Sequence, residues 1–152
     1  MFPDMGFVWI HRDPVKALAS VVNLMGTLLW CRSDTPFTNF PLEVCTDANM
    51  AAGMLSQPIT WIEEGRLPKE RLCNVQYLDF VDDPLNVAAK IYDGLNLEMT
   101  EEARVAMLTY MEENPRTKRP AHRYSVGDGD AISAERAAFK EYQDYFDVPS
   151  EV

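Results

Sequence analysis

The chain has 152 residues, of which 47% are hydrophobic and 25% are charged, a balance typical of a globular domain rather than a disordered segment. Its formal net charge of −10 argues against a broad nucleic-acid-binding surface, which needs a basic stripe. The three cysteines, Cys31, Cys45 and Cys73, form no CxxC pair, and no His, Cys and Asp cluster has metal-ligand spacing. We therefore expect reduced thiols in a cytoplasmic protein without a metal site.

A strand and a helix joined by a tight turn are predicted near the N-terminus. Residues 7–10, FVWI, are apolar on both faces of a strand, which is typical of a buried parallel strand. Asp13 then stands at an N-cap position, Pro14 follows at the first helical position, and apolar residues recur at helical spacing to about Cys31. We expect this helix to be too short and too polar to span a bilayer, which needs about 20 apolar residues.

The middle of the chain is predicted to be helical after a loop over residues 32–41, whose Pro, Ser, Thr and Asn content is typical of loops. A helix is expected from about Leu42 to Leu55. Pro58 should break or kink it, because proline cannot donate the helical hydrogen bond. The helix is then expected to restart as ITWIEEG and to end at Gly65.

A second strand is predicted at residues 73–80, CNVQYLDF, followed by a helix that begins at Asp83-Pro84. Further helices are expected after Thr100 and over residues 133–146. Strands that each feed a helix predict an α/β fold with a parallel sheet. Because two strands make a small sheet, we expect residues 1–152 to form a single domain that is part of a larger one.

Arg12 is the first candidate functional residue, because ligands of open α/β sheets bind beyond the carboxyl ends of the strands. It directly precedes a helix N-cap, where backbone N–H groups favour an anion, and its guanidinium can hold a phosphate through two hydrogen bonds. Ser20 shares a helix face with Lys16 and can reach the same anion. The alternative is that Arg12 pairs with a nearby carboxylate and that Ser20 is a packing residue.

The segment HRDPVKALAS, placed after a short apolar strand, resembles the 3′-phosphate-binding motif of sulfotransferases that use 3′-phosphoadenosine 5′-phosphosulfate (PAPS). That motif has an arginine at a strand end and a serine eight residues later, as Arg12 and Ser20 are here. The segment NVQYLDFVDDPLNVAAKIYDGLNL is similar to the second strand, acidic–proline turn and helix of the family. HRYSVGDGD, residues 122–130, resembles a C-terminal motif of the bacterial-type branch, so the resemblance covers nearly the whole chain.

The resemblance implies a P-loop-NTPase-like parallel sheet with flanking helices, of which this chain is a helix-rich C-terminal portion with few strands. It also implies transfer of a sulfuryl group from PAPS to a hydroxyl or amine of a small-molecule acceptor, with Arg12 and Ser20 on the 3′-phosphate. The family's Gly-, Ser- and Thr-rich 5′-phosphosulfate loop and its catalytic base have no counterpart among these residues. The catalytic residues are therefore unknown, and we expect the chain alone to be inactive.

A basic cluster lies within eight residues, and no carboxylate occurs between Asn114 and Gly127. Its members are Arg116, Lys118, Arg119 and Arg123. In an acidic chain such a cluster suits a polyanionic ligand such as a bisphosphorylated nucleotide, and the resemblance implies a basic loop that closes the nucleotide site. The alternative is a solvated linker between helices. His122 in the same segment can contact phosphate or cap a helix.

Aromatic side chains that can line an apolar acceptor pocket, or simply form the core, are Trp30, Phe37, Phe40 and Trp61. Two other functions stay open on the residues alone. One is a P-loop-like small-molecule kinase, and the other is a non-catalytic remnant that binds a nucleotide or a protein partner. We expect no stable membrane insertion, and an exposed sheet edge leaves a homo-oligomer open.

Overall fold

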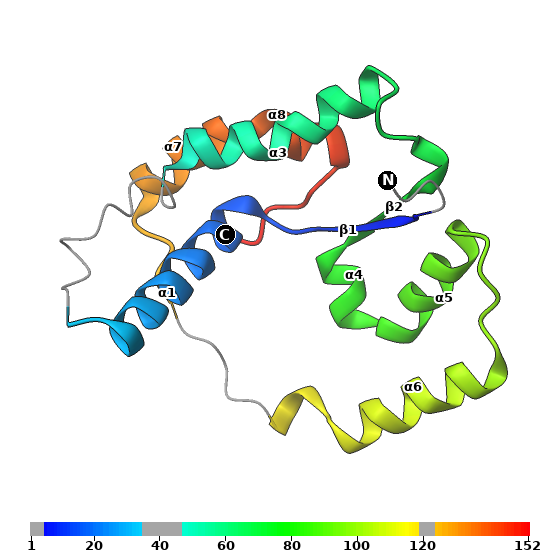
Figure 1. Cartoon of the computed structure of the whole chain (residues 1–152). Helices are drawn as coiled ribbons and strands as arrows, with labels where there is room; N and C mark the ends of the chain where they lie inside the picture. Colours follow the sequence, from blue (N-terminus) through cyan, green and yellow to red (C-terminus); the bar gives the residue numbers. More distant parts are fainter. Residues whose placement is uncertain (1–4, 35–46, 119–123) are drawn as a thin grey trace. The chain divides into compact units, whose positions relative to one another are not determined.

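The structure is a computed structural model that describes residues 5–34, 47–118 and 124–152. The chain divides into two compact units, whose helices and strands are labelled in Figure 1. The first unit consists of Met1–His11 and Gly65–His122, and the second of Arg12–Glu64 and Arg123–Val152. That residues 1–152 form a single domain within a larger one stays a prediction.

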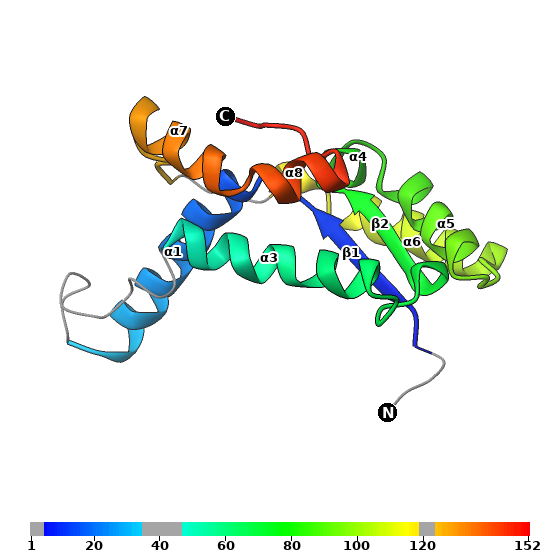
Figure 2. The same cartoon turned by 90° about the horizontal axis from the view of Figure 1, so that it is seen from above.

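The first unit is built on two parallel strands, β1 (Phe7–His11) and β2 (Leu72–Gln76), which lie side by side in Figure 2. Phe7 stands opposite Leu72 and His11 opposite Gln76. The first strand and the α/β class are confirmed. The prediction of a strand over residues 73–80 is wrong beyond Gln76. The partner strand β1 ends at His11, opposite Gln76, and offers no further backbone partners. The chain satisfies its own hydrogen bonds instead as helix α4 (Tyr77–Asp82).

Helix α5 (Pro84–Gly94) covers β2 in the first unit, where Val75 and Val87 are both buried. Asp83 caps α5 by accepting a hydrogen bond from the Asn86 amide at 3.1 Å. The remaining elements of this unit are η2 (Lys69–Arg71), α6 (Glu101–Glu113) and η3 (Arg116–Lys118). The helix starts predicted at Asp83 and at Thr100, which caps α6, are confirmed.

The burial predicted for β1 is wrong. Phe7, Val8 and Ile10 are all exposed, and His11 alone of the strand is buried. Among the described residues the sheet has two strands, so β1 is an edge strand with a single neighbour. Aromatic and β-branched residues favour a strand here, but too few elements cover its faces to bury them.

The second unit consists of four helices, α1 (Pro14–Arg32), α3 (Ala48–Glu63), α7 (Gly129–Ala138) and α8 (Lys140–Phe146). Helix α3 lies beside α7 and α8 in both views. A core of Val15, Leu18, Ala52 and Phe139 joins α1 to α3 and to the α7–α8 junction. The helix predicted from Pro14 to about Cys31, with Asp13 as its cap, is confirmed.

Helix α3 runs unbroken through Pro58, so the predicted break there is wrong. Ala52, before the proline, and Ile59 and Ile62, after it, are buried, and this packing outweighs the one helical hydrogen bond that the proline cannot make. Asp47 caps the helix, whose described part begins at Ala48. The predicted segment 42–46 and most of the predicted loop lie outside the described residues.

The last predicted helix, residues 133–146, is two helices. Helix α7 begins earlier than predicted, at Gly129, because Asp128 accepts a hydrogen bond from the Ala131 amide at 2.9 Å. The helices are separated at Phe139, whose side chain is buried in the core. The prediction of one continuous helix is therefore wrong, since burial of Phe139 decides the chain direction at this point.

Helix α1 is, among the described residues, the one helix long and apolar enough to cross a membrane by length and composition. By length and composition, the prediction that this segment is too short and too polar to span a bilayer is therefore wrong. Its first turns, however, are packed in the second unit: Val15 and Leu18 are buried there, and Lys16 is in an ion pair. Beyond these first turns, Val21, Leu24, Leu28 and Trp30 are exposed. That the chain does not insert stably into a membrane stays a prediction.

Candidate functional site

Arg12 contacts an anionic group of its own chain. Its Nε donates to Oε1 of Glu151 at 2.9 Å and its Nη2 donates to Oε2 of the same carboxylate at 3.3 Å. The Nη2 atom also lies 3.4 Å from the hydroxyl of Tyr124. The alternative in which Arg12 pairs with a nearby carboxylate is thus present in the structure. The same two-point contact shows that the guanidinium is placed to hold two oxygens of one anion.

Lys16 contacts the same carboxylate, with its Nζ 3.3 Å from Glu151 Oε2. The side chains of Arg12 and Lys16 are 25% and 31% exposed, whereas that of Glu151 is 9% exposed. Burial alone would raise the pKa of Glu151, but hydrogen bonds and charge from Arg12 and Lys16 outweigh it and hold this pKa below its ordinary value. Two cations therefore converge on one anion position.

Asp13 fixes the start of α1 and the C-terminal segment at one point. Its side chain is buried and accepts hydrogen bonds from the Val15 amide at 3.1 Å and the Glu151 amide at 2.7 Å. Arg136 of α7 donates to both carboxylate oxygens, at 2.6 and 3.0 Å. Burial would raise the pKa of Asp13, yet these hydrogen bonds and the charge of Arg136 together lower it. The N-terminus of α1 is therefore capped by the chain's own carboxylate, so anion binding here depends on side chains.

Ser20 lies on α1, half-buried, one turn beyond Lys16. Side chains four residues apart on a helix are neighbours, with Cβ atoms about 5–6 Å apart. Arg12 precedes the helix, two residues before its first residue, Pro14. Lys16 stands between Arg12 and Ser20 along the chain and shares the face of Ser20.

A groove of about 550 Å³ runs along α1. It is lined by Ala19, Val22, Asn23, Gly26, Thr27, Trp30, Tyr124 and Ser125. Tyr124 both lines the groove and contacts Arg12, so one end of the groove lies next to Arg12. Trp30, one of the aromatic residues predicted for an acceptor pocket, lies here, whereas Trp61 is half-buried on α3 and Phe37 and Phe40 lie outside the described residues.

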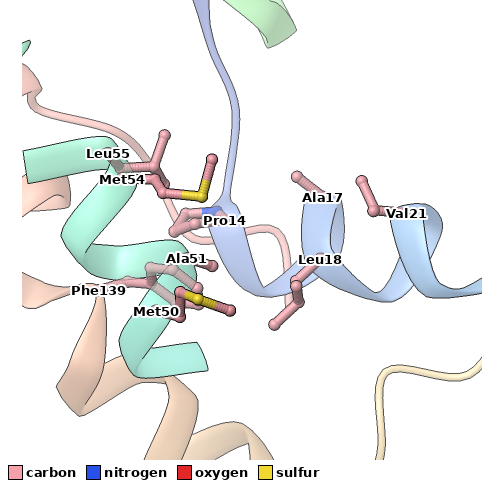
Figure 3. Close-up of a pocket in the computed structure, with 9 residues that line it drawn as sticks. All are labelled: Pro14, Ala17, Leu18, Val21, Met50, Ala51, Met54, Leu55 and Phe139. Carbon is pink, nitrogen blue, oxygen red and sulfur yellow. The ribbon is translucent and has the colours of Figure 1, made fainter. Parts of the chain in front are cut away.

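A second groove, of about 450 Å³, lies between α1 and α3 and has only apolar side chains around it. Figure 3 shows Pro14, Ala17, Leu18 and Val21 of α1 opposite Met50, Ala51, Met54 and Leu55 of α3, with Phe139 beside Ala51 and Met50. Without a polar group, this groove can take a hydrocarbon surface but cannot orient a charged ligand.

The basic cluster is described only in part. Arg116 and Lys118 form η3 in the first unit, and Lys118 Nζ donates to the Glu113 carbonyl at 2.8 Å, which helps to end α6. Arg119, His122 and Arg123 lie outside the described residues. Arg116 and Lys118 belong to the first unit, and Arg12 and Ser20 to the second.

His11, the neighbour of Arg12, has a structural position. Its ring is buried at the end of β1, its Nε2 donates to Asn74 Oδ1 of β2 at 2.9 Å, and it contacts the Trp9 ring with 4.8 Å between centroids. Burial lowers the pKa of His11, and the Asn74 hydrogen bond only partly opposes this. The described residues contain no group of three or more His, Cys, Asp and Glu side chains that could hold a metal ion.

Sequence reasoning missed three residues that contact Arg12 or Asp13, namely Glu151, Arg136 and Tyr124. Tyr124 lies in the quoted segment HRYSVGDGD, so a signal for it was present. Glu151 is 139 residues from Arg12 along the chain, and Arg136 is 123 residues from Asp13. No local sequence pattern predicts contacts between residues so far apart.

Comparisons with known proteins bear on the family and the fold of the chain. The model of the sulfotransferase family matches residues 1–101. A search of curated proteins found no significant match. Among solved structures, the crystal structure of sulfotransferase STF9 from Mycobacterium avium is similar with a TM-score of 0.64 and 24% identity. That likeness covers 95% of this chain and 36% of STF9, so the chain has the fold of part of a sulfotransferase and spans about a third of that protein's length. Because the family model covers more than half of its residues, the chain belongs to the sulfotransferase family.

Proposed function

We propose that the chain binds the 3′-phosphate of PAPS through Arg12 and Ser20 and serves sulfuryl transfer to a small-molecule hydroxyl or amine. The observation that carries the proposal is the two-point contact of Arg12 with the Glu151 carboxylate, at 2.9 and 3.3 Å. A guanidinium that holds two oxygens of a carboxylate presents the geometry that a phosphate requires. Membership of the sulfotransferase family supports PAPS as the donor.

In the proposed reaction the acceptor oxygen or nitrogen forms a bond to sulfur while the bond from sulfur to the 5′-phosphate oxygen breaks. The acceptor proton passes to a base, which is unassigned, and 3′-phosphoadenosine 5′-phosphate (PAP) leaves. Arg12 and Ser20 fix the far end of the nucleotide, and such positioning lowers the barrier by holding the reacting atoms in line. That the basic cluster of Arg116, Lys118, Arg119 and Arg123 assists with the other negative charges of the nucleotide stays a prediction from the sequence.

Calorimetric titration with PAP tests the proposal on the whole chain. Arg12→Ala should lose a charge-assisted contact worth about 2 kcal/mol, roughly thirtyfold in affinity. Ser20→Ala should weaken binding by about 1 kcal/mol, roughly fivefold. AMP, which lacks the 3′-phosphate, should bind the wild type weakly and be insensitive to both substitutions.

Arg104→Ala is the matched control, because Arg104 forms an exposed pair with Glu101 on α6 of the first unit. It should leave PAP affinity unchanged. Equal PAP affinity for the wild type and Arg12→Ala would contradict the proposal, and Ser20→Ala keeps the test decisive if Arg12→Ala does not fold. We further propose that the chain alone binds PAP without measurable sulfuryl transfer to a phenolic acceptor, and turnover in that assay would overturn this part.

A further inference from the structure

We propose that Lys16 is a third phosphate-binding residue and that Glu151 is an internal anion which the phosphate displaces. The inference rests on the proposed function and extends it, since neither residue belongs to the Arg12 and Ser20 pair. In the unliganded chain, Glu151 keeps the two cations together in the geometry that an anion needs. When the nucleotide binds, the 3′-phosphate takes the place of the Glu151 carboxylate.

The contacts of Glu151 support this role. Its Oε1 accepts from Arg12 Nε at 2.9 Å, and its Oε2 lies 3.3 Å from both Arg12 Nη2 and Lys16 Nζ. The carboxylate therefore marks a position from which both cations are within reach of one anion. Ser20 is the helical neighbour of Lys16, so an anion held by Lys16 is also near the serine hydroxyl.

Charge balance favours a phosphate monoester over the carboxylate. Arg12 and Lys16 together carry two positive charges, and Glu151 supplies one negative charge. A phosphate monoester carries about −1.5 to −2 at neutral pH and has three acceptor oxygens, so it matches the pair more completely. The neighbouring pair of Asp13 and Arg136 is neutral in itself and leaves this count unchanged.

The backbone of the C-terminal segment is held independently of the Glu151 side chain. The Glu151 amide donates to Asp13 Oδ2 at 2.7 Å, and Arg136 Nη2 donates to the Val152 carbonyl at 2.9 Å. Val148, just before, is buried, and its carbonyl accepts from Gln143 Nε2 at 3.1 Å. Rotation of one side chain therefore frees Arg12 and Lys16 without moving the segment, and the carboxylate stays close enough to return when the ligand leaves.

Calorimetric titrations of single-residue variants of the whole chain, with PAP and separately with pyrophosphate, test the inference. Glu151→Gln keeps the shape of the side chain and removes the competing charge, so PAP should bind roughly three- to fivefold more tightly. Lys16→Gln should weaken PAP binding roughly five- to tenfold. Glu141→Gln is the matched control, because it removes the same charge from α8 where the carboxylate contacts Ser56, and it should leave the affinity unchanged.

Unchanged or weaker PAP binding by Glu151→Gln would overturn the inference, while the loss in Arg12→Ala would still uphold the proposed function. Pyrophosphate binding that tightens in Glu151→Gln, together with no PAP binding by any variant, would support the internal anion and contradict the proposed donor. Absence of binding of either probe to every variant would overturn both. Should Glu151→Gln not fold, Lys16→Gln carries the test alone, and wild-type affinity in that variant would refute it.

Discussion

Arg136 donates two hydrogen bonds to the buried carboxylate of Asp13, at 2.6 and 3.0 Å. Since Asp13 follows Arg12 and caps α1, these bonds connect α7 to the N-terminus of α1. Asp13 is 1% exposed and also accepts from two backbone amides. A carboxylate removed from water in this way is tolerated only while its partners remain. The pair is therefore a structural support for the proposed phosphate site.

Arg136→Met should destabilise the chain by about 3 kcal/mol, because it leaves the Asp13 charge buried without its cationic partner. Urea unfolding followed by circular dichroism measures this loss. Lys140→Met is the matched control, since Lys140 pairs with Asp144 on the exposed surface of α8 and such pairs contribute less than about 1 kcal/mol. Equal losses in the two variants would show that the Asp13–Arg136 pair has no special weight.

Acid should remove the contributions of Asp13 and Glu151. Their pKa values in the folded chain lie below the ordinary 3.8 and 4.5, so the unfolded chain binds more protons in this range. Their stabilisation is therefore complete above about pH 4.5 and is lost as the pH falls through the folded values. The pKa of Glu135, which burial raises, changes stability in the opposite direction.

Asp13→Asn isolates the first contribution, because asparagine still caps a helix but carries no charge. At pH 7 the variant should be less stable than the wild type by about 2 kcal/mol. The difference should shrink as the pH falls below about 4, where the Asp13 carboxyl of the unfolded wild-type chain takes up a proton before that of the folded chain. A difference that stays constant from pH 7 to pH 3 would contradict a lowered pKa for Asp13.

His11 should be neutral at pH 7, with its proton on Nε2, because burial lowers its pKa below 6.5 and Asn74 accepts from that nitrogen. The folded chain then binds fewer protons than the unfolded chain below pH 6.5, so stability decreases as the pH falls through this range. NMR titration of the ring in a His122→Gln variant, which leaves one histidine, measures the pKa. Asn74→Ala should lower it further, and a pKa above 6.5 in the otherwise unchanged chain would be inconsistent with the buried, neutral ring.

Local signals in the sequence predicted the elements that carry the candidate site. The helix start at Asp13 and Pro14 depends on a side chain two residues from the amide it caps, so the printed residues suffice to locate it. The start of α5 at Asp83 and Pro84 is of the same kind. The positions of Arg12, just before the helix, and of Ser20, within it, could therefore be predicted once the start of α1 was located.

Features that depend on distant packing escaped prediction. The continuity of α3 through Pro58 comes from buried Ile59 and Ile62, and the break at Phe139 comes from its place in the core. The end of β2 at Gln76 is set by the end of β1, its partner strand. The pairing of Arg12 and Lys16 with Glu151 joins opposite ends of the chain, and a single sequence contains no periodic signal for it.

Two glycines of the second unit and its boundary should respond in opposite directions to substitution by alanine. Gly53 lies inside α3, and a Cβ added there would meet nothing within 4 Å. Gly53→Ala should therefore stabilise the chain by about 0.5–1 kcal/mol, since alanine loses less backbone entropy on forming a helix. Gly65, just after α3, has φ of +69°, a conformation that costs an L-residue about 1 kcal/mol or more. Gly65→Ala should destabilise by about that amount, and urea unfolding that moves both variants in the same direction would contradict the continuous helix ending at Glu63.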